Sequence, residues 1–507
     1  MTGPTSAASA PEPTDAADLP EQLRVRRDKY DRLTDEGRYP YPVHVERTTD
    51  LAGVRAAHRD LPPDTHTGDE VAVTGRVMFL RNTGKLAFAS IHDGEADLQL
   101  MLSLDAVGAD SLAAWKADVD LGDIVAAHGE VITSKRGELS VLVDRWQIAA
   151  KALRPLPVAH KDLSDDTRMR QRYVDLIMSA DARSMVRTRA TVLRSLRSTL
   201  DGRGYVELET PILQGVHGGA AARPFRTHVN AFDTEVTLRI ATELYLKRAL
   251  VGGISRVYEI GRTFRNEGID STHSAEFTML EAYEAFGDYD TMADLTRSLI
   301  VDAARALGLS EVLAYSAHGP VPIDLDAPWR HASVFELVSE ALGEVVDVDS
   351  DVEHLRRLAE ARDVALQPGW DAGEIVLELY EKLVERTLLQ PTFVRDYPVS
   401  VRPLARAHRG DPRLAEAWDL VIGGVELAPA YSELNDPVDQ RRRLVQQSLA
   451  AAAGDPEAME LDEDFLRALE YAMPPAGGMG MGVDRLLMVL TGRGIRETIL
   501  FPMLRPE

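Results

Sequence analysis

The segment 258–283 has the pattern of a β-hairpin, and this pattern constrains the fold more than any other in the chain. Polar and apolar residues alternate through residues 258–264, and a second alternating segment covers residues 278–283. Such alternation is typical of a strand that buries one face. Between the two, Gly268-Ile269-Asp270-Ser271-Thr272 predicts a tight loop, because glycine, aspartate and serine favour turns. The sequence therefore predicts two antiparallel strands joined by a polar connection.

The connection carries side chains that suit a nucleotide. Arg265-Asn266-Glu267 follows the first strand, and His273 and Phe277 precede the main part of the second. A guanidinium can hold a phosphate through two parallel hydrogen bonds, and an aromatic ring can lie against a purine. Alone, Arg265 and Glu267 would form a surface ion pair worth less than about 1 kcal/mol. The complete order of residues favours a binding site over such a pair.

A second arginine lies near the C-terminus, after Gly478-Met479-Gly480-Met481-Gly482-Val483-Asp484. Glycine at every second position predicts a turn in which the backbone approaches a ligand closely. The apolar run 486–490 predicts a buried helix, so Arg485 would stand at its start, on the purine face opposite Phe277. A flexible bulge before a core helix is the alternative explanation. Together with Arg265, this segment provides what a chain needs to hold a nucleoside triphosphate without a P-loop.

Length and composition indicate a globular protein with several domains. The chain has 507 residues, 45% of them hydrophobic and 27% charged, and this length predicts about two to four domains. It has no cysteine, which excludes disulfides, thiolate nucleophiles and cysteine-bound metals. Residues 1–18 lack the basic and apolar parts of a signal peptide and predict a disordered tail. No apolar run approaches the ~20 residues that span a bilayer, so we expect a cytoplasmic protein with no membrane partner.

The net charge of −24 argues against a protein that coats nucleic acid without specificity. Contacts with RNA would then depend on local basic patches. The segment from Arg24 to Lys29, continued by Arg32 and Arg38, is one candidate. A solvated helix face explains these residues equally well.

The N-terminal part predicts a helical extension, residues 19–66, followed by a β-rich block, residues 67–154. The extension contains a short helix between Pro20 and Gly37. The block has one helical pattern, residues 112–119, between its third and fourth expected strands. The strands are expected at residues 71–77, 86–91, 97–101, 124–133 and 139–143. This element order is that of an OB-fold, which commonly binds single-stranded nucleic acid.

Residues 155–180 are interpreted as a linker, and residues 181–507 as a further domain. At its start, residues 181–200 have apolar side chains on one helical face, and residues 205–211 alternate as a strand closed by proline. Such helix–strand units are common in unrelated proteins. Residues 290–391, approximately, are interpreted as a helical elaboration of this domain, because residues 352–366 and 374–388 have helical patterns.

Several carboxylates suggest a substrate with two ammonium groups, because a buried cation needs a paired charge. Glu243 is expected at a junction between a strand and a helix. Glu281 and Tyr283 are two residues apart on the second strand of the hairpin, so they face the same side. Tyr431 and Glu433 add another phenol and another acid. Each acid alone could equally be a helix cap or a solvated side chain.

These segments resemble bacterial class II lysyl-tRNA synthetases from about Leu19 to Pro506. Residues 181–211 are similar to motif 1 of class II aminoacyl-tRNA synthetases, the hairpin to motif 2, and residues 478–485 to motif 3. Segments 218–225 and 432–437 are similar to the lysyl enzymes, and Glu243 stands where aspartyl and asparaginyl relatives typically have glutamine. The resemblance implies an α+β protein with an N-terminal OB-fold β-barrel and a class II catalytic domain, in which helices flank an antiparallel sheet.

The resemblance also implies a role for each matching residue. The catalytic residues would be Arg265 and Arg485. ATP would be bound by Arg265, Glu267, His273, Phe277 and Arg485. L-Lysine would be bound by Gly219, Glu243, Glu281, Tyr283, Tyr431 and Glu433. Mg²⁺ would be held by Asp419 and Glu426. The anticodon of lysine tRNA would be contacted by Arg81, Phe88 and Gln99.

The implied activity is that of a lysine-tRNA ligase in protein synthesis. L-Lysine would be activated by ATP to lysyl-adenylate and then transferred to the 3′ end of lysine tRNA, by a homodimer joined through motif 1. No nucleophilic side chain is needed, because the lysine carboxylate attacks the α-phosphorus and the protein supplies positioning and charge neutralisation. The chain departs from the family at Pro429, where many members have an amide, at Asp419, which replaces a more usual glutamate, and at residues 167–170.

Two alternatives are a specialised paralogue and a non-catalytic, tRNA-binding regulator. The paralogue would be an inhibitor-tolerant duplicate or an enzyme that lysylates a protein or a lipid. The protein-modifying relatives lack an OB domain and the lipid-modifying ones add membrane helices, so the sequence favours neither. A regulator is expected to lose Arg265 or Arg485, and both are present.

Overall fold

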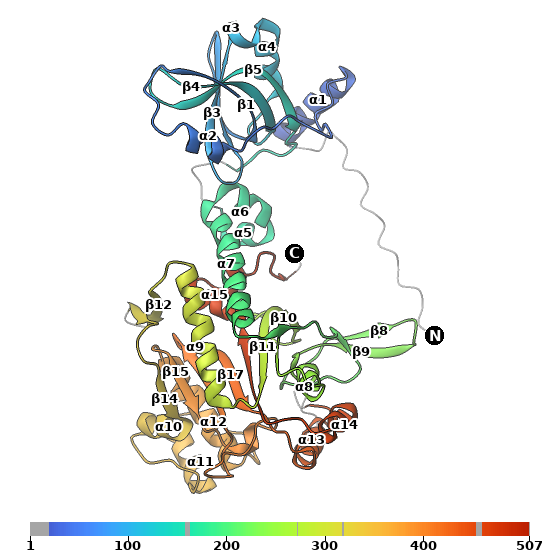
Figure 1. The fold of residues 1–507 in the computed structure, drawn as a ribbon, viewed down its shortest axis with the longest axis vertical. Coiled ribbons are helices and arrows are strands. Elements are labelled where there is room, and N and C mark those ends of the chain that lie inside the picture. Colours follow the sequence, from blue (N-terminus) through green and yellow to red (C-terminus); the bar gives the residue numbers. More distant parts are fainter. Residues whose placement is uncertain (1–19, 158–162, 271, 317–318, 453–458, 506–507) are drawn as a thin grey trace. The chain divides into compact units, whose positions relative to one another are not determined.

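The structure is a computed structural model that describes residues 20–157, 163–270, 272–316, 319–452 and 459–505. The chain divides into two compact units (Figure 1). The smaller unit comprises Met1–Asp165 and Tyr173–Met178, and the larger comprises Asp166–Arg172 and Ser179–Glu507. The predicted tail, residues 1–18, lies outside the described residues. No helix among the described residues is long and apolar enough to cross a membrane.

The smaller unit contains a closed barrel with the strand order β1-β2-β3-β5-β4. Its strands are β1 His66–Asn82, β2 Leu86–His92, β3 Asp97–Ser103, β4 Ile124–Thr133 and β5 Leu139–Ala150. Helices α3 Leu104–Val107 and α4 Ala109–Asp118 lie between β3 and β4. The five predicted strands and the predicted helix are confirmed, and Trp115 of α4 packs against the inward side chains of the barrel.

Two helices, α1 Glu21–Asp35 and α2 Leu51–Ala57, precede the barrel. Three of the basic residues of α1 are engaged within this unit. Lys29 pairs with Asp120 (2.7 Å) and Arg32 pairs with Asp118. Arg26 donates to the carbonyl oxygens of Ala152 and Leu121. These contacts attach α1 to its own unit, so part of the basic run has a structural explanation, while Arg24 and Arg27 are exposed.

The larger unit is built on an eight-stranded sheet with the order β14-β15-β16-β17-β18-β11-β10-β6. Its strands are β6 Val206–Glu207, β10 Arg256–Phe264, β11 Glu276–Ala285, β14 Arg330–Ser333, β15 Thr392–Arg395, β16 Ala417–Ile422, β17 Val425–Ser432 and β18 Ala476–Gly482. Pairing is antiparallel from β15 to β10 and parallel at both edges. The predicted hairpin is β10 and β11, with Thr263 opposite Phe277.

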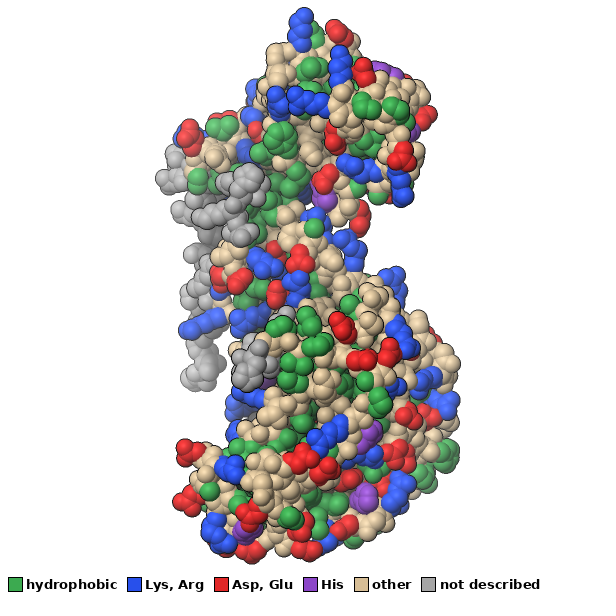
Figure 2. All heavy atoms as spheres, turned by 90° about the vertical axis from the view of Figure 1, so that its left-hand side faces the viewer, with side chains coloured by type: hydrophobic (Ala, Val, Ile, Leu, Met, Phe, Trp, Pro, Cys, Tyr) green, Lys and Arg blue, Asp and Glu red, His purple; other side chains and the backbone are tan. Residues whose placement is uncertain are grey.

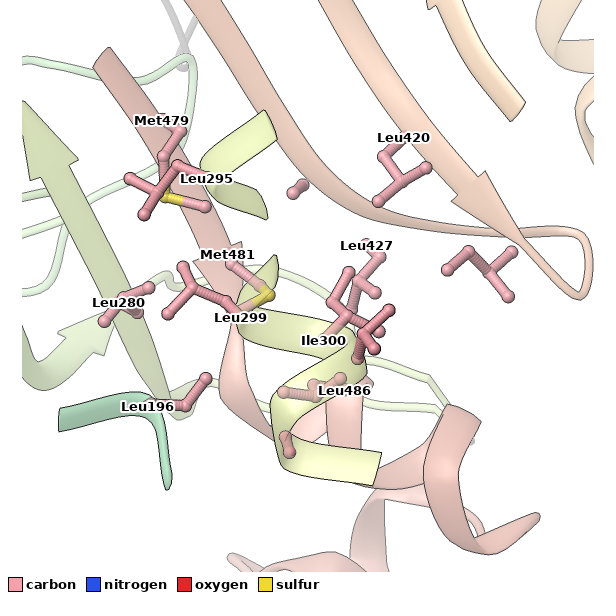
Figure 3. Packing of buried hydrophobic residues seen from close by; sticks show 14 of the residues in the cluster. Leu196, Leu280, Leu295, Leu299, Ile300, Leu420, Leu427, Met479, Met481 and Leu486 are labelled. Carbon is pink, nitrogen blue, oxygen red and sulfur yellow. The ribbon is translucent and has the colours of Figure 1, made fainter. Parts of the chain in front are cut away.

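One face of this sheet is covered by helices α7 Ala180–Gly202, α9 Tyr289–Ala306 and α15 Val483–Thr491. Leu280 of β11 and both methionines of β18 belong to the apolar core on this face (Figure 3). Because side chains alternate along a strand, the other side is faced by Glu281 and Tyr283 of β11 and by the β18 glycines Gly478, Gly480 and Gly482. That second face carries the candidate site.

Smaller elements complete the larger unit. Strands β7 Leu213–Gln214, β8 Arg226–Val229 and β9 Thr234–Leu238 form a three-stranded sheet, and β12 Glu311–Ser316 pairs with β13 Gly319–Asp324. Helix α6 Arg172–Met178 falls almost entirely in the smaller unit. The remaining α-helices among the described residues are α5 Asp165–Arg170, α8 Glu243–Val251, α10 Val334–Leu342, α11 Val352–Glu360, α12 Ala372–Leu383, α13 Pro437–Ala452, α14 Glu463–Glu470 and α16 Ile495–Thr498. Short 3₁₀ helices are η2 Glu385–Thr387 and η3 Val399–Val401.

Several sequence-based expectations need correction. The glycine-rich segment is the central strand β18, not a turn, since it pairs with β11 on one side and with β17 on the other. The connection of the hairpin, residues 265–275, is longer than the tight loop predicted. The predicted strand at residues 205–211 is reduced to β6. Residues 155–180 include the helices α5 and α6, and residues 290–391 include β12, β13 and β14 besides helices.

Acidic and basic side chains are interspersed over the face of the molecule drawn in Figure 2. The chain as a whole carries a net charge of −24. Among the side chains coloured in that view, neither sign forms a broad continuous surface. Non-specific attraction to a polyanion is therefore not favoured by that face.

Candidate functional site

Arg265 lies directly after β10, where the hairpin leaves the sheet. Its N–H donates to the carbonyl oxygen of Ala275 (2.9 Å), which extends the β10–β11 ladder by one step. The guanidinium carbon lies 5.3 Å from the centroid of the Phe277 ring, a separation typical of a cation–π contact. Burial lowers the pKa of Arg265, and nearby carboxylates, chiefly that of Glu267, oppose this effect. A half-buried guanidinium of this kind is suited to receive an anion.

Arg485 enters the same region from the start of α15. Its Nη1 donates to the carbonyl oxygen of Glu426 (2.8 Å), and its Nη2 lies 3.3 Å from Nε2 of His273. His273 contacts the carboxylate of Asp270 through Nδ1 (3.0 Å). The backbone N–H of Thr272, together with His273, holds the pKa of Asp270 well below its usual range. Glu267 accepts a hydrogen bond from the N–H of Arg223 (3.2 Å).

These side chains line one cavity, which we call the nucleotide cavity. Its walls include all five residues predicted to bind ATP, namely Arg265, Glu267, His273, Phe277 and Arg485. They also include Met279, Glu426, Pro429, Gly482 and Asp484. The structure therefore brings two distant guanidinium groups and one aromatic ring to the same space. Such walls can accept a flat base and an anionic chain together.

Asp484 and Arg189 support this arrangement, and the sequence reasoning assigned neither. Asp484 is 2% exposed and accepts hydrogen bonds from Arg189 of α7 and from the N–H of Thr278 (2.7 Å). This network joins α7, β11 and the first turn of α15, so it fixes the residue that follows, Arg485. For Asp484, its position directly before Arg485 was an available signal in the sequence. Arg189 gave no local signal, because one more arginine in an amphipathic helix is unremarkable.

A second cluster, the acidic pocket, lies on the same face of the sheet and consists of Glu243, Glu281, Glu433, Tyr283 and Lys247. The three glutamates are 5%, 4% and 2% exposed. Glu281 accepts hydrogen bonds from the hydroxyl of Tyr283 (3.0 Å) and from the N–H of Thr242 (2.9 Å). The prediction that Glu281 and Tyr283 share a face is confirmed.

Lys247 joins two of these acids. Its Nζ lies 2.6 Å from Oε1 of Glu243 and 2.5 Å from Oε2 of Glu433, and the residue is 0% exposed. Glu243 begins α8 and Lys247 follows one turn later, while Glu433 comes directly after β17. The sequence reasoning missed Lys247. Its spacing of four residues from Glu243 within one helix was the available signal.

Two glycines make room for the acidic pocket. Gly478 lies opposite both Tyr283 and Tyr431 in the sheet. A Cβ at Gly478 would lie 2.0 Å from Oε1 of Glu433 and 2.3 Å from the ring of Tyr283. Gly219 has a φ of +87°, and its Cβ would lie 3.0 Å from that of Glu243. Glycine is therefore required at both positions.

Burial shapes the titration of the pocket. It raises the pKa of Glu281 to about 7, with Glu243 adding to the effect and the N–H of Thr242 opposing it. It raises the pKa of Glu433 to about 8, although Lys247 favours the charged form. Acids with such pKa values lack sufficient positive charge around them, so the pocket is suited to a cationic ligand.

A larger cavity of about 870 Å³ adjoins the acidic pocket. Gly219 and Tyr431 line it, together with Arg402 and side chains of α12 such as Glu374 and Glu378. Burial raises the pKa of Tyr431, so this phenol stays neutral. Tyr431 and Gly219 therefore lie at the boundary between the acidic pocket and open space.

Asp419 and Glu426, the predicted magnesium ligands, lie on the neighbouring strands β16 and β17. One carboxylate oxygen of Asp419 is bound by Arg402. Burial raises the pKa of Asp419 to about 6, with Arg402 opposing the shift and Glu426 adding to it. Among the described residues, no group of three histidine, aspartate or glutamate side chains is arranged to hold a metal. Two carboxylates on neighbouring strands fit Mg²⁺ when substrate phosphates supply further ligands.

In the smaller unit, the three predicted anticodon residues share one sheet surface. Arg81 of β1 lies directly opposite Phe88 of β2. Gln99 of β3 lies opposite Ser90, two residues from Phe88 and therefore on the same face. Gln99 donates to the hydroxyl of Ser140 (2.8 Å). An exposed cation beside a half-buried ring is an arrangement on which a base can stack.

Comparison with known families agrees with this arrangement. A family model described as "OB-fold nucleic acid binding domain" matches residues 71–149. A model described as "tRNA synthetases class II (D, K and N)" matches residues 164–505. An OB barrel followed by an antiparallel sheet with arginines from two motifs around one cavity is the architecture of a class II tRNA synthetase. The chain belongs to the D, K and N family of these enzymes.

Proteins named lysine–tRNA ligase are similar to this chain over nearly its whole length. The "Lysine--tRNA ligase 1" of Mycobacterium tuberculosis is 55% identical over 504 residues, which cover 97% of this chain and 98% of the relative. The "Lysine--tRNA ligase" of Kineococcus radiotolerans is 56% identical over 493 residues, which cover 97% of this chain and 98% of the relative. The "Lysylphosphatidylglycerol biosynthesis bifunctional protein LysX" of Mycobacterium marinum is 50% identical over 96% of this chain but only 44% of its own length.

Proposed function

We propose that the protein is a lysine–tRNA ligase that activates L-lysine with ATP and transfers it to the 3′ end of lysine tRNA. The observation that carries the proposal is the convergence of Glu243, Glu281 and Glu433 beside the nucleotide cavity. Three buried acids have a reason to gather where the ligand is a cation. The high identity to relatives named lysine–tRNA ligase supports the same substrate.

In the nucleotide cavity, Arg265 binds the α-phosphate of ATP and the carboxylate of lysine. Phe277 and Arg485 enclose the adenine, while Glu267 and His273 lie along the nucleotide. The lysine carboxylate attacks the α-phosphorus in line and pyrophosphate leaves. Because no side chain forms a covalent bond, these residues act by holding the reactants and neutralising charge.

In the acidic pocket, Gly219 and Glu243 receive the α-ammonium group of lysine. Glu281, Tyr283, Tyr431 and Glu433 receive its side chain. The D, K and N family also includes enzymes for aspartate and asparagine, whose side chains carry no positive charge. A pocket of three glutamates would repel aspartate and leave buried charge unpaired around asparagine.

Mg²⁺ would be held by Asp419 and Glu426 and would supply further positive charge at the phosphates of ATP. Pro429 lines the nucleotide cavity without a side-chain donor, so the backbone and Arg265 must meet the polar groups of the ligand there. The anticodon of lysine tRNA would contact Arg81, Phe88 and Gln99. A homodimer formed through α7 and β6, and a cytoplasmic location, complete the proposal.

The experiment that tests this function is ATP–pyrophosphate exchange with each of the twenty amino acids. We expect exchange to depend on lysine. Charging of lysine tRNA, with lysine transfer to phosphatidylglycerol measured in parallel, then identifies the acceptor. Exchange that depends on aspartate or asparagine, or on no amino acid, would refute the proposed function.

A further inference from the structure

Lys247 is a cation buried inside the pocket proposed for a cationic substrate. Its Nζ lies within 2.6 Å of carboxylate oxygens from both Glu243 and Glu433, and no part of the residue is exposed. Burial opposes its charge, but the two carboxylates outweigh this effect and raise the pKa of Lys247. The residue therefore stays protonated. Adenylation as proposed above uses it neither as a base nor as a nucleophile.

A count of charges indicates what Lys247 does. The acidic pocket has three carboxylates and one ammonium group, which leaves two net negative charges when all are ionised. The substrate lysine has two ammonium groups, and its single carboxylate is directed to Arg265. Pocket and ligand therefore cancel when one lysine is bound. A third unpaired carboxylate would be costly in so buried a place.

We infer, on the basis of the proposed function, that Lys247 is a positioning residue that fixes the pocket at two negative charges and so adapts it to one dicationic amino acid. It also holds Glu243 and Glu433 at a set separation, because one ammonium group binds both. These two acids come from different elements, α8 and the end of β17. Lys247 thus controls both the number and the position of the charges that face the substrate.

Other charged groups around the pocket form ion pairs with one another. Asp462, directly before α14, pairs with Arg248 (2.8 Å), which is next to Lys247 in α8. Arg402, near Tyr431, is engaged by Asp419. The strand β18 presents Gly478 to the pocket. The groups that face the ligand space are Glu243 and Lys247 of α8, Glu281 and Tyr283 of β11, and Tyr431 and Glu433 at the end of β17.

Removal of the positive charge at Lys247 has a predictable effect on titration. With three acids and no resident cation, the pKa of Glu433 would rise further, because Lys247 now favours its charged form, and the pocket would take up a proton near neutral pH. A protonated carboxyl group cannot pair with a substrate ammonium. Lysine binding should then weaken at neutral pH and recover as the pH increases, because the proton is released again.

The test compares Lys247→Gln and Lys247→Met with the wild-type protein. Glutamine keeps hydrogen-bond donors near the two acids without the charge, and methionine removes both. We measure KM for lysine and for ATP by pyrophosphate exchange from pH 6 to pH 9. At pH 7 we expect KM for lysine to rise at least about tenfold, as a shift of one pKa unit implies, and to fall again towards pH 9. KM for ATP should stay within about twofold, since the nucleotide cavity is unchanged.

Lys382→Gln is the matched control. Lys382 follows Glu378 by four residues in α12 and pairs with it at 3.4 Å, but its side chain is 58% exposed. This variant should keep both KM values and their pH dependence. It separates the loss of a buried cation from the loss of any helical lysine–glutamate pair.

Each result bears on the inference. If Lys247→Gln keeps the wild-type KM for lysine at every pH, the charge count is wrong. If both Lys247 variants lose ATP binding and melt far below the wild type, the ion pairs serve folding alone, and the inference is also wrong. A wild-type protein without lysine-dependent exchange would instead refute the proposed function.

Discussion

Nη2 of Arg485 lies 3.3 Å from Nε2 of His273, although 212 residues separate the two in the chain. His273 belongs to the connection of the β10–β11 hairpin, and Arg485 to the first turn of α15. The strand β18 pairs with β11 and leads directly into α15, so sheet order brings these residues together. The nucleotide cavity therefore depends on the central strands of the sheet and not on a flexible loop alone.

We predict that Arg265→Ala lowers the rate of lysine-dependent pyrophosphate exchange by about 10²–10³. Removing one hydrogen-bond donor to a charge that develops in the transition state costs other enzymes about this much. The circular dichroism spectrum should stay that of the wild type. Arg262→Ala is the control, because Arg262 lies on β10, three residues before Arg265, with its side chain 42% exposed, and its contact with Glu276 is long (3.5 Å). Equal exchange rates for the two variants would contradict the role given to Arg265.

Gly478→Ala should abolish measurable lysine binding, because the new methyl group would occupy the space of the Glu433 carboxylate and the Tyr283 ring. Gly480→Ala is a close control on the same face of β18. Its Cβ would lie 3.2 Å from the flexible methyl group of Met279, which can move. Calorimetric titration with lysine compares the two. Wild-type affinity in Gly478→Ala would show that the acidic pocket does not receive lysine.

Lysine affinity should increase with pH between about 6 and 8.5. Burial raises the pKa of Glu281 to about 7 and that of Glu433 to about 8, above the usual value of about 4.3. The folded protein without lysine thus binds more protons than the unfolded chain, and these two acids destabilise it increasingly as the pH rises from about 4 to 8. Lysine replaces the protons with ammonium groups, so it should raise the melting temperature more at pH 8 than at pH 6. An equal or smaller shift at pH 8 would oppose this assignment.

Phe88→Ala should weaken charging of lysine tRNA and leave pyrophosphate exchange unchanged, because loss of one stacking ring costs about 1–3 kcal/mol of RNA binding. Arg145→Ala serves as the control, since Arg145 lies on β5 next to β4 and pairs with Glu46 at the surface. KM for the tRNA is the relevant measurement. If Phe88→Ala charges tRNA as the wild type does, base stacking by Phe88 is not part of recognition.

The periodicity of the sequence predicted which segments form helices and strands better than it predicted the contacts between them. The five barrel strands, the helix α7 and the hairpin were readable because each buries one face with its own period. The glycine-rich strand was misread as a turn, since the reason for glycine at position 478 lies in Glu433 and Tyr283, which are distant in sequence. The short strands β12 and β13 were missed within a region of helical patterns.

The candidate site was only partly readable for the same reason. The types of residue in the acidic pocket suggested a dicationic ligand, but their convergence depends on the strand order β17-β18-β11. Lys247 was overlooked because lysine four residues after glutamate is common on exposed helices. Only its complete burial between two carboxylates distinguishes it.

The central claim is that one chain brings an ATP site and a lysine site together. Pyrophosphate exchange with the wild-type protein, measured with lysine and with no amino acid added, tests this claim most directly. We expect exchange that requires lysine and falls by about 10²–10³ in Arg265→Ala. Exchange that proceeds equally without lysine, or at the wild-type rate in Arg265→Ala, would contradict this expectation.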